Sequence, residues 1–133
     1  MALLDFPEGV EVFTVTAGEE PLRLVFLVTR TREGIIVQLL GGDKPHVGAI
    51  VLSLPRPSRS VPEERRTTTT VLPLYGHQDD EVARPVAEEL ARKSGQPVVV
   101  VAGIHIDQAS AADIERIKLY TQEGLRLLLQ NFF

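Results

Sequence analysis

Residues 97–106 are apolar at almost every position, on both faces that a β-strand would present. A strand of this kind has to be covered on both sides, so it predicts a central position in a sheet. One helical pattern precedes it, from a cap at Asp79–Asp80 to an end at Ser94–Gly95, and another begins at Ser110. This order of helix, strand and helix implies one right-handed crossover that places the strand near residue 100 inside the sheet.

The two helical patterns differ in how much apolar surface they carry. The first has a single stripe, Val82, Val86 and Leu90, and Pro85 predicts that this helix starts late or bends. The second begins with a capping box, Ser110 with Asp113. Its main stripe consists of Ile114, Ile117, Thr121, Leu125 and Leu128. Further apolar residues lie outside that stripe: Tyr120, Leu127, Leu129, Phe132 and Phe133. This surplus predicts a homodimer interface, or else cover for a sheet edge or for the N-terminal segment.

The first half of the chain has the pattern of short strands joined by turns. The expected strands are Val10–Val15, Leu22–Arg30, Ile35–Leu40, Val47–Leu54 and Arg66–Leu72. The short turns between the first four predict an antiparallel meander, and a long loop is expected at residues 55–65. The predicted fold class is therefore α+β: one domain over residues 1–133, with a mostly antiparallel sheet of about six strands. The meander is followed by β-α-β-α, with two helices packed on one face of the sheet.

Composition excludes several classes of function. A net charge of −4 and a pI near 5.4 argue against binding to nucleic acid or to an anionic membrane surface. The chain has no cysteine, which excludes disulfides, zinc ribbons and thiol catalysis and fits a reducing cytoplasm. We see neither a signal peptide nor an apolar run approaching the roughly 20 residues of a membrane helix. We therefore expect a soluble, cytoplasmic protein.

The three histidines, His46, His77 and His105, all lie in polar, glycine-bearing junctions beside apolar strands. The carboxylates most able to act with them lie in the same junctions: Asp43, Asp79, Asp80 and Asp107. If the junctions meet in the fold, they form one polar site. Imidazole and carboxylate could hold zinc, iron or manganese through the three histidines. The spacing lacks any H-x-x-x-H pair, and the simpler alternative is that each histidine bonds a neighbouring group.

Two other kinds of chemistry remain open. An anionic ligand such as a flavin phosphate could use Lys44, Arg66, the hydroxyls of Thr67–Thr70 and the helix N-terminus near Asp80. However, the chain has neither a G-x-G-x-x-G nor a P-loop motif, and the acidic residues at the helix start would repel phosphate. A nucleophile elbow is also missing. Acid–base work through His105 with Asp107, or His77 with Asp79, is possible, but enzyme activity is not the favoured interpretation.

Three segments taken in order resemble a known family: residues 41–49, 77–83 and 99–107. The resemblance covers roughly residues 35–130. It is to the prenylated-flavin chaperones, small accessory subunits of UbiD-type decarboxylases similar to the D subunit of gallate decarboxylase and related in fold to proteasome assembly chaperones. It implies a dimer of α+β domains that binds prenylated FMN and assists maturation of a UbiD-type decarboxylase. The matching site positions are His46 with its glycine loop, His77 with Asp79, and His105 with Asp107.

We therefore predict a non-catalytic, cofactor-binding chaperone, with prenylated FMN or FMN as cargo. The predicted cofactor-binding residues are Gly41, Gly42, Lys44, His46, Gly48, Arg66, Thr68, Thr70, His77, Asp79, His105 and Asp107. The chain has only seven aromatic residues, so the flavin ring would have to lie against few rings or against aliphatic and backbone surfaces. The alternatives are a cofactor-free assembly chaperone of the proteasome type, and a metal-dependent enzyme that uses His46, His77 and His105.

Overall fold

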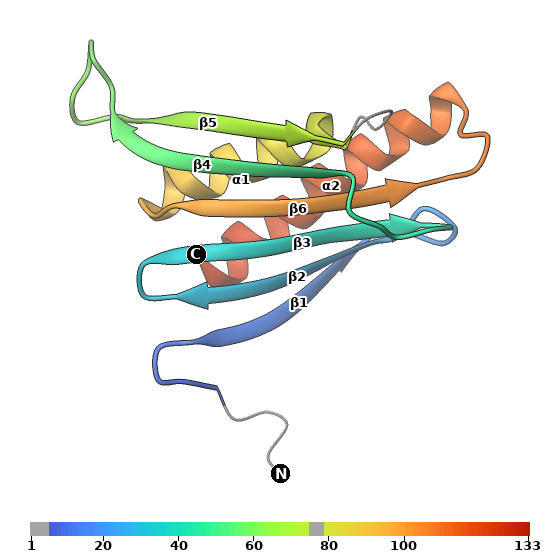
Figure 1. The fold of residues 1–133 in the computed structure, drawn as a ribbon, viewed down its shortest axis with the longest axis horizontal. Helices are drawn as coiled ribbons and strands as arrows, with labels where there is room; N and C mark the ends of the chain where they lie inside the picture. The colour runs from blue at the N-terminus through green and yellow to red at the C-terminus, as the bar shows by residue number, and fades with distance from the viewer. Residues whose placement is uncertain (1–5, 75–78) are drawn as a thin grey trace.

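The computed structural model describes residues 6–74 and 79–133, which form one six-stranded sheet with both helices on the same face (Figure 1). The strands are β1 (Glu11–Ala17), β2 (Leu24–Thr31), β3 (Gly34–Gly42), β4 (Ala49–Pro57), β5 (Arg65–Pro73) and β6 (Val98–His105). The helices are α1 (Asp80–Ser94) and α2 (Ala111–Phe132). The predicted α+β class, the six strands and the shared helical face are confirmed.

The strand order is β1-β2-β3-β6-β4-β5, so β6 is central as its apolar sequence predicts. It pairs in parallel with β3 and antiparallel with β4. In one detail the expected meander is wrong, because β3 and β4 are not neighbours. Because β6 is apolar on both faces, it takes a central place in the sheet, between β3 and β4. The connection from β3 to β4 therefore passes the carboxyl end of β6.

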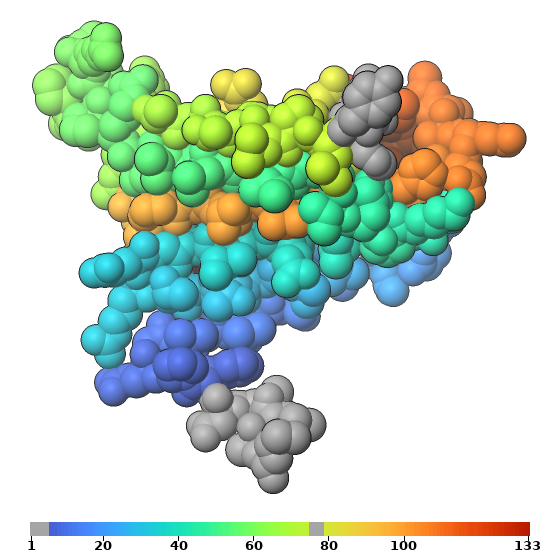
Figure 2. All heavy atoms as spheres, viewed as in Figure 1, coloured from blue at the N-terminus to red at the C-terminus, as the bar shows by residue number. Residues whose placement is uncertain are grey.

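The expected loop at residues 55–65 is mostly a hairpin. β4 continues to Pro57 and β5 starts at Arg65, so that the connection is residues 58–64. Proline lacks the backbone N–H that would donate to a neighbouring strand, so it is tolerated where one edge of its strand has no neighbour. Here the pairing of β4 with β6 ends at Ser53 while its pairing with β5 continues, so the prolines at 55 and 57 are tolerated. The end of this hairpin projects at the upper left of Figure 2.

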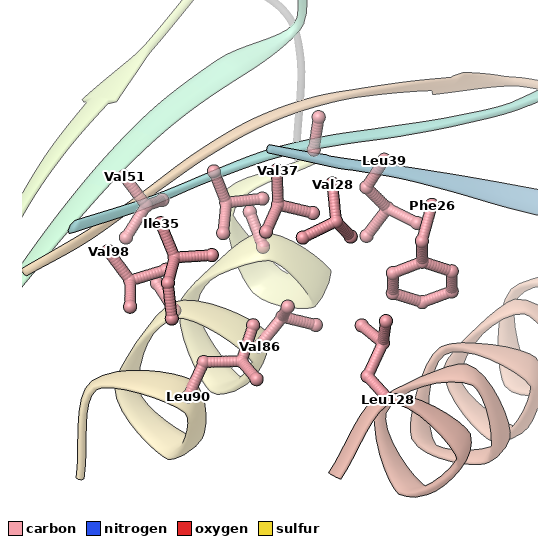
Figure 3. Packing of buried hydrophobic residues seen from close by; sticks show 14 of the residues in the cluster. Phe26, Val28, Ile35, Val37, Leu39, Val51, Val86, Leu90, Val98 and Leu128 are labelled. Carbon is pink, nitrogen blue, oxygen red and sulfur yellow. The ribbon is translucent and has the colours of Figure 1, made fainter. Parts of the chain in front are cut away.

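The helices begin and end largely where their sequences predict. Helix α1 starts at Asp80, so Pro85 does not delay it, and it ends at Gly95 in the left-handed conformation. Helix α2 begins with the expected capping box of Ser110 and Asp113. The core lies between the sheet and the helices, with Val86 and Leu90 of α1 and Leu128 of α2 turned toward the strands (Figure 3).

The surplus apolar residues of α2 lie largely against the first strand. Phe132 stacks on Phe13 of β1 with ring centroids 3.9 Å apart, and Tyr120 packs against the core beside Gly18. The alternative interpretation of the surplus, cover for a sheet edge, therefore accounts for these residues.

A second apolar surface is the side of the sheet that faces away from the helices, here called the open face and seen in Figure 2. Strand alternation places apolar side chains there that a monomer leaves to water: Val12, Ile36, Ile50, Leu52, Leu54 and Leu72. Leu72 is 61% exposed and Leu54 is 43% exposed. Contiguous apolar surface of this kind marks a site of interaction. Among the described residues, neither helix has the length and apolar character to cross a membrane.

Candidate functional site

Two of the three histidine junctions meet at the carboxyl ends of the parallel strands β3 and β6. Gly42 is in register with His105, and the amide of Asp43 donates to the carbonyl of His105 at 2.7 Å. The chain then turns back over β6, and the amide of Gly48 donates to Ala102 at 2.8 Å. The imidazole rings of His46 and His105 lie 6.1 Å apart, edge to face. These two junctions therefore lie together, as a single polar site would require.

Glycines make this meeting sterically possible. A Cβ on Gly103 would overlap the carbonyl oxygen of His46, and one on Gly48 would overlap the carboxylate of Asp79. Gly42, at φ +81°, combines a left-handed backbone with contact to the His105 backbone. The glycines of this region thus serve the close approach of one protein segment to another. This is a different use from the ligand approach that the sequence suggested.

Asp79 is the most buried acidic group of the site, with a side chain 7% exposed. Its carboxylate accepts from the amide of Ile104 at 2.9 Å and lies 3.4 Å from Nε2 of His46. Although it occupies the N-cap position of α1, its side chain makes no capping hydrogen bond. Asp79 instead connects the start of α1 to the end of β6 and to the histidine loop.

This connection predicts the effect of removing the Asp79 carboxylate. Asp79→Ala leaves the Ile104 amide without its acceptor, which should lower the free energy of unfolding by about 1–3 kcal/mol. Asp79→Asn keeps an acceptor oxygen and should recover most of that loss. Chemical denaturation of the two variants measures the difference. Equal stability of both variants would contradict the proposed role of the hydrogen bond to Ile104.

The second histidine belongs to an exposed cluster on the neighbouring loop. Nε2 of His105 lies 2.9 Å from Oδ1 of Asp107, and Nζ of Lys44 lies 3.6 Å from the same oxygen. The hydrogen bond to His105, followed by the charge of Lys44, lowers the pKa of Asp107 below its ordinary value. The amide of Asp107 also donates to Asp43 at 3.1 Å. The cluster holds Asp107 as a carboxylate beside one cation.

A cavity of about 290 Å³ lies beside the histidines, between the start of α1, the end of β6 and the first turns of α2. It is here called the β6 pocket. Its walls are mainly apolar, with carboxylates and a lysine at the polar positions: Asp79, Glu81, Val82, Ile104, His105, Ile106, Ala109, Ile114, Ile117 and Lys118. Two predicted site residues, Asp79 and His105, line it. An apolar wall with a few polar groups is the usual construction of a small-molecule site.

The sequence does not indicate the apolar half of this pocket. Its patterns place Ile104 and Ile106 in or beside a strand, and Ile114 and Ile117 in a core stripe. In the structure Ile114 is 45% exposed, because α2 packs against the core mainly through Thr121, Gly124 and Leu128, further along the helix. A core stripe that extends beyond its covering sheet is the signal that could have indicated the pocket.

Other predicted residues do not join the site within one chain. Arg66 lies in register with Arg56 and is paired with Glu64 at 3.4 Å, whereas the site end of β5 is at Pro73. Seven residues of strand, roughly 23 Å, separate those positions. Thr68 and Thr70 lie between them on β5, on the open face. His77 lies outside the described residues, and within the described part of the chain no three histidines and carboxylates form a metal-binding group.

The assembled geometry offers the elements of a small-molecule binding site. It offers an apolar hollow for a ring or chain, with His105 and Lys118 in its lining, while Lys44 lies outside it beside Asp107. Both helix N-termini nearby carry their own acidic residues, Asp80 and Glu81 on α1 and Asp113 on α2. These carboxylates oppose a phosphate at the helix ends, so an anionic group would have to lie toward the lysines.

Comparisons with known proteins agree with this picture. The chain matches a solved structure described as a novel chaperone complex for yeast 20S proteasome assembly, at 17% identity and a TM-score of 0.61. The match covers 92% of this chain and 97% of that one, and it supports the fold. Comparison with curated proteins gave no significant match. The family model for the prenylated flavin chaperone LpdD-like domain matches residues 18–132. The chain therefore belongs to the LpdD-like family of prenylated flavin chaperones.

Proposed function

We propose that this protein is a non-catalytic accessory chaperone that holds prenylated FMN and assists its loading into a UbiD-type decarboxylase in the cytoplasm. The observation that carries the proposal is the β6 pocket, which places an apolar hollow beside His105 and Asp79 in a chain of the prenylated flavin chaperone family. Two of the three segments that resemble the family meet at this pocket. The cargo would be prenylated FMN or FMN.

The pocket suits part of a flavin rather than a whole one. A volume of about 290 Å³ is at the small end for drug-sized ligands, which is enough for a planar ring system or its prenyl-derived edge. Aliphatic walls such as Ile104, Ile106 and Ile117 compensate for the scarcity of aromatic rings. The ribityl phosphate would extend toward Lys44 and Lys118. A cargo held by one part remains accessible to a receiving enzyme.

The side chains of the site support binding of a cargo more than they support catalysis. Asp79 is engaged by the Ile104 amide, and Asp107 is held ionised by His105 and Lys44. A general acid or base needs a pKa near the working pH, and the lowered pKa of Asp107 moves it away from that range. We therefore propose that the histidines orient the flavin.

We further propose that the protein is a homodimer that packs open face to open face. The open face carries Ile50, Leu52 and Leu54 on β4 alone, and two sheets packed in this way would bury them in a sandwich. This proposal replaces the α2 interface expected from the sequence.

Titration of the purified protein with FMN and with prenylated FMN tests the cargo proposal. We expect saturable binding of prenylated FMN, with a change in its absorbance spectrum. The His46→Ala/His105→Ala variant should bind at least about 10-fold more weakly, which corresponds to about 1.4 kcal/mol. Thr14→Ala, on an exposed position of β1, is a matched surface control that should leave affinity unchanged. Unchanged affinity in the histidine variant would contradict the site, and absence of all binding would contradict the cargo.

One observation favours a second candidate, an assembly chaperone without cofactor. The open face is a large apolar surface on a fold shared with a proteasome assembly complex, and it could receive a different protein chain. The two candidate functions differ in whether partner binding depends on the cofactor. An assembly chaperone should bind its partner protein equally well with and without prenylated FMN, whereas the flavin chaperone should bind the decarboxylase in a cargo-dependent manner.

A further inference from the structure

Strand β5 forms one edge of the sheet, and within the described part of the chain its outer side has no neighbouring strand (Figure 1). Edge strands of natural proteins are commonly protected by charged side chains, by proline or by a bulge. Between Thr67 and Val71, β5 has none of these, because the segment consists of four threonines and a valine in continuous register with β4. These five residues, about 17 Å of strand, are therefore open to pairing with another chain.

The register shows which backbone groups point outward. The Ser58 amide donates to the Glu64 carbonyl at 2.8 Å, and the Leu74 amide donates to the Gly48 carbonyl at 2.9 Å. These bonds extend the β4–β5 register at both ends, and hydrogen-bonded pairs alternate with non-hydrogen-bonded pairs along an antiparallel ladder. The even-numbered residues of β5 therefore bond β4. The amides and carbonyls that point to the free edge are those of Thr67, Thr69 and Val71.

The two sides of this edge differ in polarity. On the helix side, the hydroxyl of Thr67 donates to Glu88 of α1 at 3.4 Å, and Glu88 is paired with Arg84. On the open face, Leu72 lies beside Ile50 and is 61% exposed. A strand added here would place alternate side chains on the two sides. It would therefore fit a segment in which polar residues alternate with apolar ones.

The free edge also leads to the histidine site. Beyond Val71, the Leu74 amide bonds Gly48, and Gly48 lies directly against the carboxylate of Asp79. Asp79 in turn lines the β6 pocket. A chain paired with β5 would therefore have one end close to the pocket.

We propose that the free edge of β5 binds an extended segment of the enzyme that receives the cargo, as an added strand of the sheet. The inference rests on the proposed function and adds the docking site and the conformation of the docked segment. Outward amides and carbonyls at every second residue are complementary to the backbone of a β-strand, whereas a helix bonds its own backbone groups. A second copy fits this edge less well, because a stable dimer buries about 800 Å² on each partner, far more than a five-residue strand pair provides.

Amide hydrogen exchange at single-residue resolution tests the proposal. The protein loaded with prenylated FMN is measured alone and with a UbiD-type decarboxylase that lacks its cofactor. We expect exchange at Thr67, Thr69 and Val71 to slow at least about 10-fold in the complex, while Thr68 and Thr70 are protected in both samples. A complex that leaves the three outward amides in fast exchange would overturn the proposal. Protection that rises with protein concentration without the enzyme would assign the edge to a second copy, and would overturn it as well.

A pair of substitutions at Thr67 provides the second measurement. Thr67 stands opposite Pro55, in a pair whose amides the β4–β5 ladder does not use, so Thr67→Pro keeps that ladder and removes one outward donor. It should weaken decarboxylase binding about 10-fold and leave flavin affinity unchanged. Thr67→Ala keeps the amide and should bind the enzyme within about 2-fold of the original protein.

Equal binding of the decarboxylase by the two Thr67 variants would contradict docking at this edge. Absence of decarboxylase binding by the loaded original protein would contradict it too. Neither result bears on the cargo, because the flavin titration measures cargo binding without any partner. Circular dichroism checks that Thr67→Pro is folded, and the exchange experiment needs no substitution.

Discussion

Replacing Gly103 by alanine is expected to lower the free energy of unfolding by about 3 kcal/mol and to disrupt the histidine site. The new Cβ would overlap the carbonyl oxygen of His46, which is backbone and cannot rotate away. Gly103 is not one of the described glycines with a positive φ. The effect therefore comes from the steric overlap and not from backbone strain. The loop that carries His46 would have to move, and cargo binding should be lost with it. Denaturant titration and flavin titration measure the two effects.

Gly34→Ala is the matched control for this prediction. A Cβ at Gly34 would meet its nearest neighbour, the carbonyl of Pro97, at 3.4 Å, which is ordinary contact. We expect a stability change within about 1 kcal/mol and unchanged flavin affinity. If Gly103→Ala behaved like this control, the close contact between β6 and the His46 loop would not exist in solution.

Replacing Leu52 by glutamate is expected to dissociate the proposed open-face homodimer while leaving the monomer folded. Leu52 is 39% exposed in one chain and lies at the middle of the open face, beside Val99. A charge there would be buried without a partner in a sandwich of two sheets, which should weaken dimerisation by at least about 30-fold, or 2 kcal/mol. Sedimentation gives the dissociation constant, and circular dichroism checks the fold.

Leu119→Glu provides the matched control on the other side of the molecule. Leu119 is more exposed, at 62%, but belongs to α2 and faces away from the proposed interface. The same chemical change there should leave the dimer intact. Dissociation by Leu119→Glu with no effect of Leu52→Glu would return the interface to the helix, as the sequence first indicated.

The sequence predicts the helices and strands of this fold better than it predicts which strands lie next to each other. Residues 97–106 indicated a central strand because a chain apolar on both faces needs cover on both sides. Their consequence for β3 and β4 was missed, because local turn patterns do not reveal that a later strand enters between earlier ones. Prolines 55 and 57 suggested a loop for a similar reason: whether a strand edge is free depends on where its neighbour ends.

The candidate site, too, could be predicted from the sequence only in part. The glycine-bearing junctions of His46 and His105 correctly indicated a meeting point, since parallel strands bring their carboxyl ends together. The apolar pocket beside them depends on where α2 leaves the core, which helical periodicity alone cannot show. Arg66 and Thr68 were grouped with the histidines by chemical type, and within one chain the sheet holds them apart.

The most direct test of the central claim is delivery of the cargo. The protein is loaded with prenylated FMN and mixed with a UbiD-type decarboxylase that lacks its cofactor, and the appearance of active enzyme is followed over time. We predict faster and more complete activation than with the same amount of free prenylated FMN, and loss of that advantage with His46→Ala/His105→Ala. Activation at the same rate with and without the protein would contradict a chaperone role in cofactor loading.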